Sequence, residues 1–212
     1  MTVSKPAPEL VGGHIALDLV NTVSWRLDQG RQHDYLSCFP ALAAWCRRTG
    51  LLDEPAAQDL LAAAVRHPEL AQQAVYDTRA LREHLYTLLA ALIDSDAPAP
   101  VTVPPGLRLV LLDALTRSDL AGPPMRWQLA GHQPADIPRM LALQALDLLQ
   151  GLGTYPLRQC QGPGCGWLFL DRARNRTRRW CSSGDCGNRD RARRHYARHR
   201  TAAPLAPGEP SR

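Results

Sequence analysis

Four cysteines near the C-terminal end of the chain have the spacing of a metal site. They form two pairs, Cys160/Cys165 and Cys181/Cys186, with four residues inside each pair and fifteen residues between the pairs. Four thiolates that the chain can bring to one point supply the tetrahedral sulfur set that structural zinc prefers. Because four protein ligands leave no coordination position open, we expect one structural zinc ion and no metal-based catalysis.

Free thiols, disulfides and histidine ligands are the alternatives to a four-cysteine site. The N-terminal sequence has no charged region followed by an apolar run, and no segment reaches the length of a membrane span, so we expect a cytoplasmic protein. A reducing compartment favours metal over disulfides. His195 and His199 are four residues apart and could also bind metal, but the cysteines already complete a tetrahedron. Cys38 and Cys46 are isolated among apolar residues and are predicted to be ordinary core thiols.

Positive charge is concentrated around the cysteines. Between Arg158 and Arg200 the sequence has twelve arginines and three aspartates, a net charge of +9. The whole chain carries +5, which leaves −4 for everything outside this window. The uneven distribution predicts a mildly acidic body and a strongly basic C-terminal part with different partners.

The arginines of the basic part predict a surface for an anionic partner. Phosphate is the obvious anion, because the guanidinium fork can hold two of its oxygens at once. We expect nucleic acid, because a basic stripe on a zinc module is its electrostatic footprint. Double-stranded DNA is preferred because the polar C-terminal helix could enter a groove, and the sequence shows no pattern of the stacking aromatics that mark single-strand binders. The alternatives are a solubilising surface, or docking onto the acidic body. The candidate nucleic-acid-binding residues are Arg172, Arg174, Arg176, Arg178, Arg179, Arg189, Arg193 and Arg194.

The elements around the cysteines predict a small treble-clef-like zinc finger. The segment CQGPGCG is rich in glycine and can turn tightly around a metal. Residues 167–170 and 179–181 are predicted to be strands joined by the loop 171–178. A helix is expected from about Cys186 onward, with its positive end near the thiolates. Asn188 and Arg189 could contact nucleic acid, or they could cap the helix and brace the zinc loops.

The preceding sequence predicts a mostly helical body. Apolar residues recur at helical spacing over residues 14–25, 40–49, 53–66, 69–93 and 135–150. The alternating segment 125–130 predicts a strand, paired in a hairpin with a neighbour near 109–121. Periodicity cannot decide between helix and strand for residues 107–116. The expected fold class is therefore α+β: a mostly helical body with a small hairpin (residues 10–152), the zinc finger (153–200) and a disordered tail (201–212).

Polar residues in the mainly apolar N-terminal helix suggest a second site. Asp18, Asn21 and Arg26, together with Arg79 from the long helix, could line a pocket for a small-molecule effector. The alternative is that these side chains cap or hydrogen-bond neighbouring turns inside the body. No phosphate-binding loop or nucleophile elbow is present in the sequence, so we expect that the protein is not an enzyme.

Segments at both ends of the chain resemble two known bacterial families. The run Cys186-Gly187-Asn188-Arg189, with the preceding FLDRARNRTRRW, is similar to the CGNR zinc finger. The segments GGHIALDLVNT and TRALREHL resemble the ABATE domain, which precedes that finger in bacterial proteins. The resemblance covers about residues 10–200 and implies that Cys160, Cys165, Cys181 and Cys186 are the zinc ligands.

Proteins that look like this are regarded as stress-related transcriptional regulators whose finger binds nucleic acid. The resemblance therefore implies a DNA-binding regulator. We expect the N-terminal domain to act as a sensor, or as a homodimerisation unit that supplies a second half-site. An RNA- or ribosome-associated zinc protein, and a protein-interaction module that uses the basic finger, remain the alternatives.

Overall fold

The computed structural model describes residues 7–94, 102–129 and 133–201, and the elements below belong to these ranges. The helices are α1 (Ile15–Val20), α2 (Phe39–Arg48), α3 (Glu54–Arg66), α4 (Pro68–Ile93), α5 (Pro105–Thr116), α6 (Asp136–Gln150) and α7 (Asn188–Thr201), with a π-helical turn, η1 (Ser183–Gly187), before α7. The strands are β1 (Val23–Ser24), β2 (His33–Asp34), β3 (Asp119–Ala121), β4 (Arg126–Gln128), β5 (Leu157–Gln159) and β6 (Leu168–Leu170). They form three antiparallel pairs, β1–β2, β3–β4 and β5–β6. The mostly helical fold with small hairpins is the predicted one.

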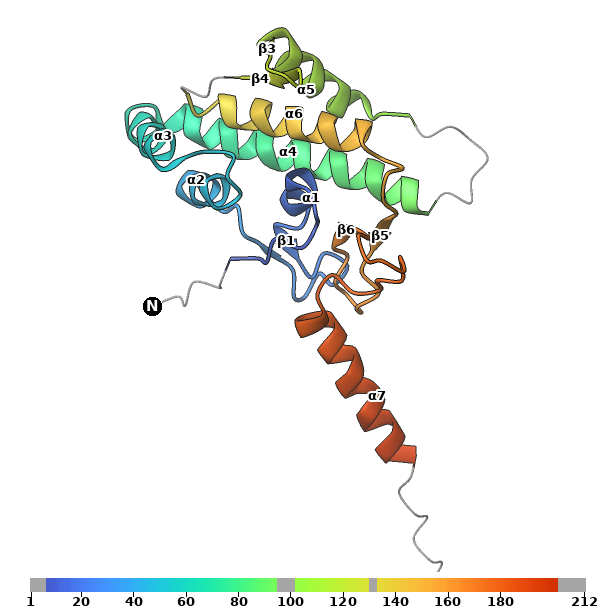
Figure 1. Ribbon diagram of the computed structural model, residues 1–212. Helices are drawn as coiled ribbons and strands as arrows, with labels where there is room; N and C mark the ends of the chain where they lie inside the picture. Colours follow the sequence, from blue (N-terminus) through green and yellow to red (C-terminus); the bar gives the residue numbers. More distant parts are fainter. Residues whose placement is uncertain (1–6, 95–101, 130–132, 202–212) are drawn as a thin grey trace, which may run out of the picture.

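Helix α4 is the centre of the helical body. It contacts α1, α2, α3, α5 and α6, and Figure 1 shows α4 and α6 running side by side through the middle of the molecule. Leu81, Leu85, Leu88 and Leu89 recur every three or four residues and are all buried. This spacing gives α4 one continuous apolar face, so burial against its neighbours stabilises a helix of 26 residues.

Most body elements lie where the sequence predicts them. Helices α2, α3, α4 and α6 match the predicted ranges to within about one residue, and the undecided segment 107–116 is helical, as part of α5. The predicted hairpin is β3–β4, in which Leu120 faces Trp127. Residue 130 and the predicted disordered residues 202–212 lie outside the described ranges. No helix in the described part of the chain is long and apolar enough to cross a membrane.

The N-terminal helix is shorter than predicted, because Asn21 ends it. The prediction extended this helix to residue 25, but α1 stops at Val20. The Asn21 amide donates to the carbonyl oxygen of Leu168 (2.8 Å) and accepts from its N–H (2.9 Å). The side-chain amide of Asn21 thus pairs with strand β6 in the way the backbone of a neighbouring strand would. After Asn21 the chain leaves the helix and forms β1. Sequence periodicity could not show this contact with a residue 147 positions away.

The predicted strand at residues 179–181 is absent, and β6 pairs with β5 instead. Leu157 lies opposite Leu170, and Gln159 lies opposite Leu168. Gly164 and Gly166 both have positive φ (74° and 72°), which glycine adopts without steric cost. These two residues let the chain fold back between the strands, so β5 and β6 close around the first cysteine pair. Residues 179–181 keep one backbone bond to this loop, from Gln161 N–H to the Arg179 carbonyl (3.0 Å).

Strand β6 belongs to two cores at once. Its side chains alternate, so Leu168 and Leu170 pack into the core of the helical body, while Phe169 packs with the four cysteines. Helix α1 lies against β6, and the N–H of Leu170 donates to the carbonyl of Gly12 (2.9 Å). The metal centre is therefore attached to the body through buried backbone and not through a free linker.

We expect Asn21→Ala to destabilise the protein by about 2–4 kcal/mol, because both backbone groups of Leu168 would lose their partner in a buried position. Asn21 and Leu168 are 1% and 0% exposed. Urea unfolding followed by circular dichroism measures the change. The matched control is Asn175→Ala, at an exposed loop position, which should change the free energy of unfolding by less than about 0.5 kcal/mol. Equal stability of the two variants would contradict this role of Asn21.

Candidate metal centre and arginine-rich helix

The four cysteine sulfurs form one buried cluster. The Sγ atoms of Cys160, Cys165, Cys181 and Cys186 all lie within 4.8 Å of one another. The sulfurs of Cys165 and Cys181 are 3.8 Å apart, and those of Cys181 and Cys186 are 3.5 Å apart. Zinc–sulfur bonds of about 2.3 Å at tetrahedral angles would put the sulfurs about 3.8 Å apart. The cluster has the size and donor set for one zinc ion.

Tight turns bring the backbone close to these sulfurs. Gly162 donates its N–H to the Cys160 sulfur (3.4 Å), and the N–H of Cys181 donates to the same sulfur (3.3 Å). A Cβ atom added to Gly162 would lie only 2.8 Å from the sulfur of Cys186. Position 162 therefore has no room for a side chain.

Arg189 places a positive charge beside the sulfur cluster. Arg189 donates to the Cys186 sulfur (2.8 Å) from the first turn of α7 and also pairs with Asp185. Hydrogen bonds from Cys165, Cys181 and Cys186 hold the pKa of the Cys160 thiol well below its usual range, whereas their hydrogen bonds with Cys160 raise the pKa of the Cys165 and Cys181 thiols. Negative charge on these sulfurs is the form that binds a metal cation. The predicted place of Cys186, just before the last helix, is observed, although a π-helical turn (η1) carries it.

Arg178 braces the metal centre from inside. Its guanidinium donates to the carbonyls of Val11 (3.1 Å), Trp180 (3.0 Å, through Nε) and Cys181, and lies over the ring of Phe169 at 4.1 Å. These contacts fix the second cysteine pair to the N-terminal segment. Arg178 thus has its donors engaged within the protein, unlike a side chain presented to a partner.

The loop after β1 holds the start of α7. The ring of Trp25 lies between two guanidinium groups, with Arg31 at 3.2 Å and Arg189 at 4.5 Å from its centroid. The next residues bind the first cysteine pair through their backbone, since Arg26 N–H donates to the Cys165 carbonyl (3.0 Å). Trp167 Nε1–H donates to the carbonyl of Val23 (2.8 Å). The N-terminal segment therefore sets both the position of the finger and the direction of α7.

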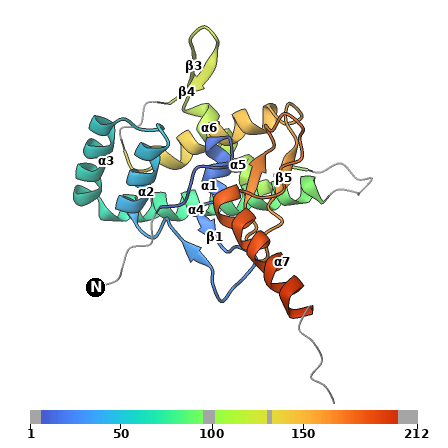
Figure 2. The same ribbon diagram turned by 60° about the horizontal axis from the view of Figure 1, so that its bottom comes forward.

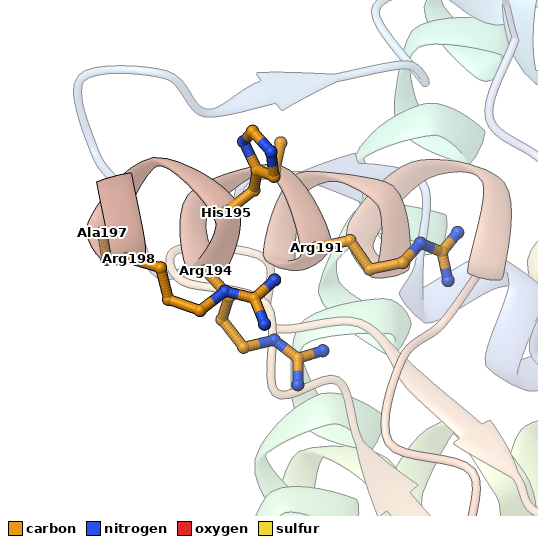
Figure 3. Close-up of a pocket in the computed structure, with 6 residues that line it drawn as sticks. Arg191, Arg194, His195, Ala197 and Arg198 are labelled. Carbon is orange, nitrogen blue, oxygen red and sulfur yellow. The ribbon is translucent and has the colours of Figure 1, made fainter. Parts of the chain in front are cut away.

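Helix α7 projects away from the rest of the molecule (Figures 1 and 2). Residues 191–198 are all exposed, including Tyr196 at 69%. Arg191, Arg194 and Arg198 lie along one side of the helix and His195 lies on another (Figure 3). The spacing of three, then four, residues places these arginines on the same face. The helix thus presents a row of guanidinium groups that no body element covers.

The structure separates the candidate arginines into two groups. Arg178 and Arg189 brace the finger, as described above, and Arg189 therefore fits the structural alternative. Arg172, Arg174, Arg176 and Arg179 surround the exposed 171–178 loop, while Arg193 and Arg194 lie on α7. Arg191 and Arg198 were not among the candidates, although the helical spacing with Arg194 was visible in the sequence.

The four candidate pocket residues make internal bonds and are not brought together around one cavity. Asp18 accepts from Gly12 N–H (2.8 Å), and Asn21 pairs with Leu168. Arg26 pairs with Glu83 (2.5 Å). Arg79 donates to the Leu36 carbonyl (2.9 Å) and lines a separate cavity between α2, α3 and α4.

Purified protein should contain one zinc ion per chain, because the four sulfurs complete one tetrahedron. Removing the metal with a chelator should expose four additional thiols to a thiol reagent and unfold the segment around Cys160–Cys186. Metal analysis and thiol titration before and after chelation measure both quantities. The Cys38 thiol, which the sequence predicts to be in the core, is instead exposed. It therefore reacts with the reagent before and after chelation and gives the background thiol count. Purified protein that holds no zinc, and whose number of reactive thiols does not change on chelation, would contradict the site.

We expect Gly162→Ala to weaken zinc binding about tenfold or more, because its Cβ would displace the Cys186 sulfur and overpacking costs about 1–3 kcal/mol. Gly184→Ala is the matched control, since its Cβ would meet only the Ser182 hydroxyl at 3.8 Å. Competition with a chromogenic chelator gives the relative affinities. If both variants hold zinc as tightly as the natural protein, the close approach of Gly162 to the Cys186 sulfur does not determine zinc affinity.

Two family models match the chain, one after the other. The ABATE model, described as "Putative stress-induced transcription regulator", matches residues 13–152, and the CGNR zinc finger model matches residues 157–199. A comparison with curated proteins finds no match. The two matches confirm the resemblance seen in the sequence, and the finger match agrees with the four close cysteines. The chain therefore belongs to the ABATE family and carries a CGNR zinc finger suited to bind one zinc ion.

Proposed function

We propose that this protein is a transcriptional regulator that binds double-stranded DNA through α7. The observation that supports this most is the row of Arg191, Arg194 and Arg198 on a helix that projects from the body (Figure 3). A single helix of this kind fits the width of the major groove of B-form DNA, about 12 Å. The 171–178 loop and the residue after it add four exposed arginines, Arg172, Arg174, Arg176 and Arg179, that could contact the phosphate backbone.

Charge on α7 supports a polyanionic partner. Residues 188–198 contain five arginines and one aspartate, which gives this segment a net charge of +4. Asp190 pairs with Arg193 (2.6 Å) and Arg194 (2.7 Å). Both arginines are more than half exposed, whereas the Asp190 side chain is only 6% exposed. The two arginines therefore hold a buried carboxylate and keep their outer faces in water, where a phosphate can reach them. Binding to phosphates would release condensed counterions and add affinity.

The shape of α7 favours DNA over RNA. The major groove of A-form RNA is too narrow and deep for side chains to read, and single-strand binders rely on aromatic platforms. Tyr196 is the one tyrosine in the sequence of α7, which has no phenylalanine or tryptophan and otherwise offers only the rings of His195 and His199 for stacking on a base. In this proposal zinc supports the position of α7 and takes no part in a reaction, because four sulfurs leave it no open position. The protein accordingly acts by binding and not as an enzyme.

A second copy would supply a second recognition helix. One finger contacts few base pairs, and paired half-sites raise both affinity and specificity. Exposed apolar side chains on α5 and on the projecting hairpin β3–β4 (Figure 2) support a homodimer, since a two-stranded hairpin is marginal in water without a covering partner. These side chains are Leu109, Leu112, Leu120, Met125 and Trp127.

We expect binding to duplex DNA to weaken steeply with salt. If about five phosphates are engaged, log K should fall with log salt concentration with a slope of roughly −4 to −5. Arg194→Gln should weaken binding and make this slope less steep by about 0.9, because one phosphate contact is lost. Fluorescence anisotropy with pools of random duplexes measures both, and sedimentation counts the chains on each duplex.

Arg66→Gln, at an exposed position on α3, is the matched control and should leave the slope unchanged. Zinc content should stay at one ion in both variants. RNA pools run in parallel test the alternative partner. Tighter binding to RNA, or binding to duplex DNA that is insensitive to salt, would overturn the proposal.

A further inference from the structure

A cavity far from the metal centre along the chain lies between α2, α3 and α4. Its volume is about 620 Å³, within the range of about 300–1,000 Å³ that is usual for small-molecule sites. The wall is largely apolar and includes Leu61 and Val65 of α3 and Val75 and Tyr76 of α4. Val65 and Tyr76 are 83% and 68% exposed, so two large side chains at this cavity remain in contact with water.

Arg79 gives one wall of the cavity a positive charge. Three guanidinium groups, those of Arg26, Arg79 and Arg82, share the two carboxylates of Asp34 and Glu83. Among these five groups, positive charge exceeds negative charge by one.

The geometry assigns this excess to Arg79. Arg82 is 4% exposed and binds Asp34 through two hydrogen bonds of 2.8 Å, which satisfies that carboxylate. Arg79 reaches Asp34 only through Nε, at 3.3 Å, and its side chain is 38% exposed. Within the described part of the chain, its two terminal nitrogens make no hydrogen bond. They remain available to an anion at the cavity.

The start of α2 adds to the positive potential. Cys38, Phe39 and Pro40 line the cavity, and Cys38 caps α2 without a side-chain hydrogen bond. The N-terminal end of a helix carries a partial positive charge and favours anions. Arg79 and this helix end thus border the same apolar cavity.

We propose that this cavity binds a small amphipathic carboxylate. The carboxylate lies against Arg79 and the start of α2, and the apolar part packs against Leu61, Val65 and Val75. Charge complementarity selects the acid over a neutral molecule of the same length, because only the carboxylate gives Arg79 a charge-assisted hydrogen bond. The site is independent of the metal centre and of any nucleic acid.

The proposal is tested with octanoate and 1-octanol, two probes that share a chain length and differ in charge. Titration of the full chain, followed by amide NMR, should show saturable binding of octanoate with shifts concentrated in α2, α3 and α4. Octanol should bind at least tenfold more weakly. Equal affinities for both probes, no saturable octanoate binding, or shifts spread over the whole chain would overturn the proposal.

Variants separate the charge of the site from its shape. Arg79→Gln should weaken octanoate binding at least tenfold. Arg66→Gln is the matched control, because Arg66 is exposed on the last turn of α3 but does not line the cavity. Ala64→Met places a larger side chain in the wall without changing charge and should also weaken binding. Far-UV circular dichroism checks that each variant is folded. Unchanged octanoate affinity in both folded cavity variants would contradict the site. Because the assay contains no nucleic acid, a failure of the octanoate proposal would leave the DNA proposal intact.

Discussion

Four buried sulfur atoms within 4.8 Å of one another impose the strongest constraint on this structure. Thiolates this close repel one another, and a cation at their centre converts the repulsion into four metal–ligand bonds. The surrounding chain is arranged for that outcome. Gly162 makes room for the Cys186 sulfur, two backbone N–H groups point at Cys160, and Arg189 adds positive charge from α7. Metal binding and folding of this segment are therefore expected to be coupled.

The position of the metal centre depends equally on the N-terminal segment. Asn21 pairs with β6, Trp25 holds Arg189, and Arg178 reaches back to Val11. Each contact joins residues more than 140 positions apart in the sequence. Because β6 contributes side chains to both cores, a change in the helical body can reach the finger through packed atoms. This connection joins the helical body to the finger and, through Trp25 and Arg189, to the start of α7.

The arginines of the finger have two different roles that composition alone does not separate. Those with partners on several segments, such as Arg178, stabilise the fold, and their loss would leave buried carbonyls without donors. On the exposed side of α7, Arg194 pairs with Asp190 and Arg191 donates to the Ser183 carbonyl, and both side chains stay exposed to solvent. The same distinction holds at the α2–α4 cavity, where Arg82 is fully engaged with Asp34 and Arg79 is not. At the cavity we assign binding to Arg79, the arginine that Asp34 satisfies least.

The sequence by itself determined the features that depend on local spacing. The cysteine pairs, the long helices and the basic C-terminal segment were all predictable, since helical periodicity and metal-ligand spacing involve residues close along the chain. Only the tertiary structure decided where α1 ends, which strand pairs with β6, and which arginines are internal. Leu168 sets the end of α1, and two turns at glycine residues set the pairing of β6 with β5. The role of Arg178 follows from its bond to a carbonyl on the distant N-terminal segment. Such contacts leave no periodic signal, because their energy comes from partners that only folding brings together.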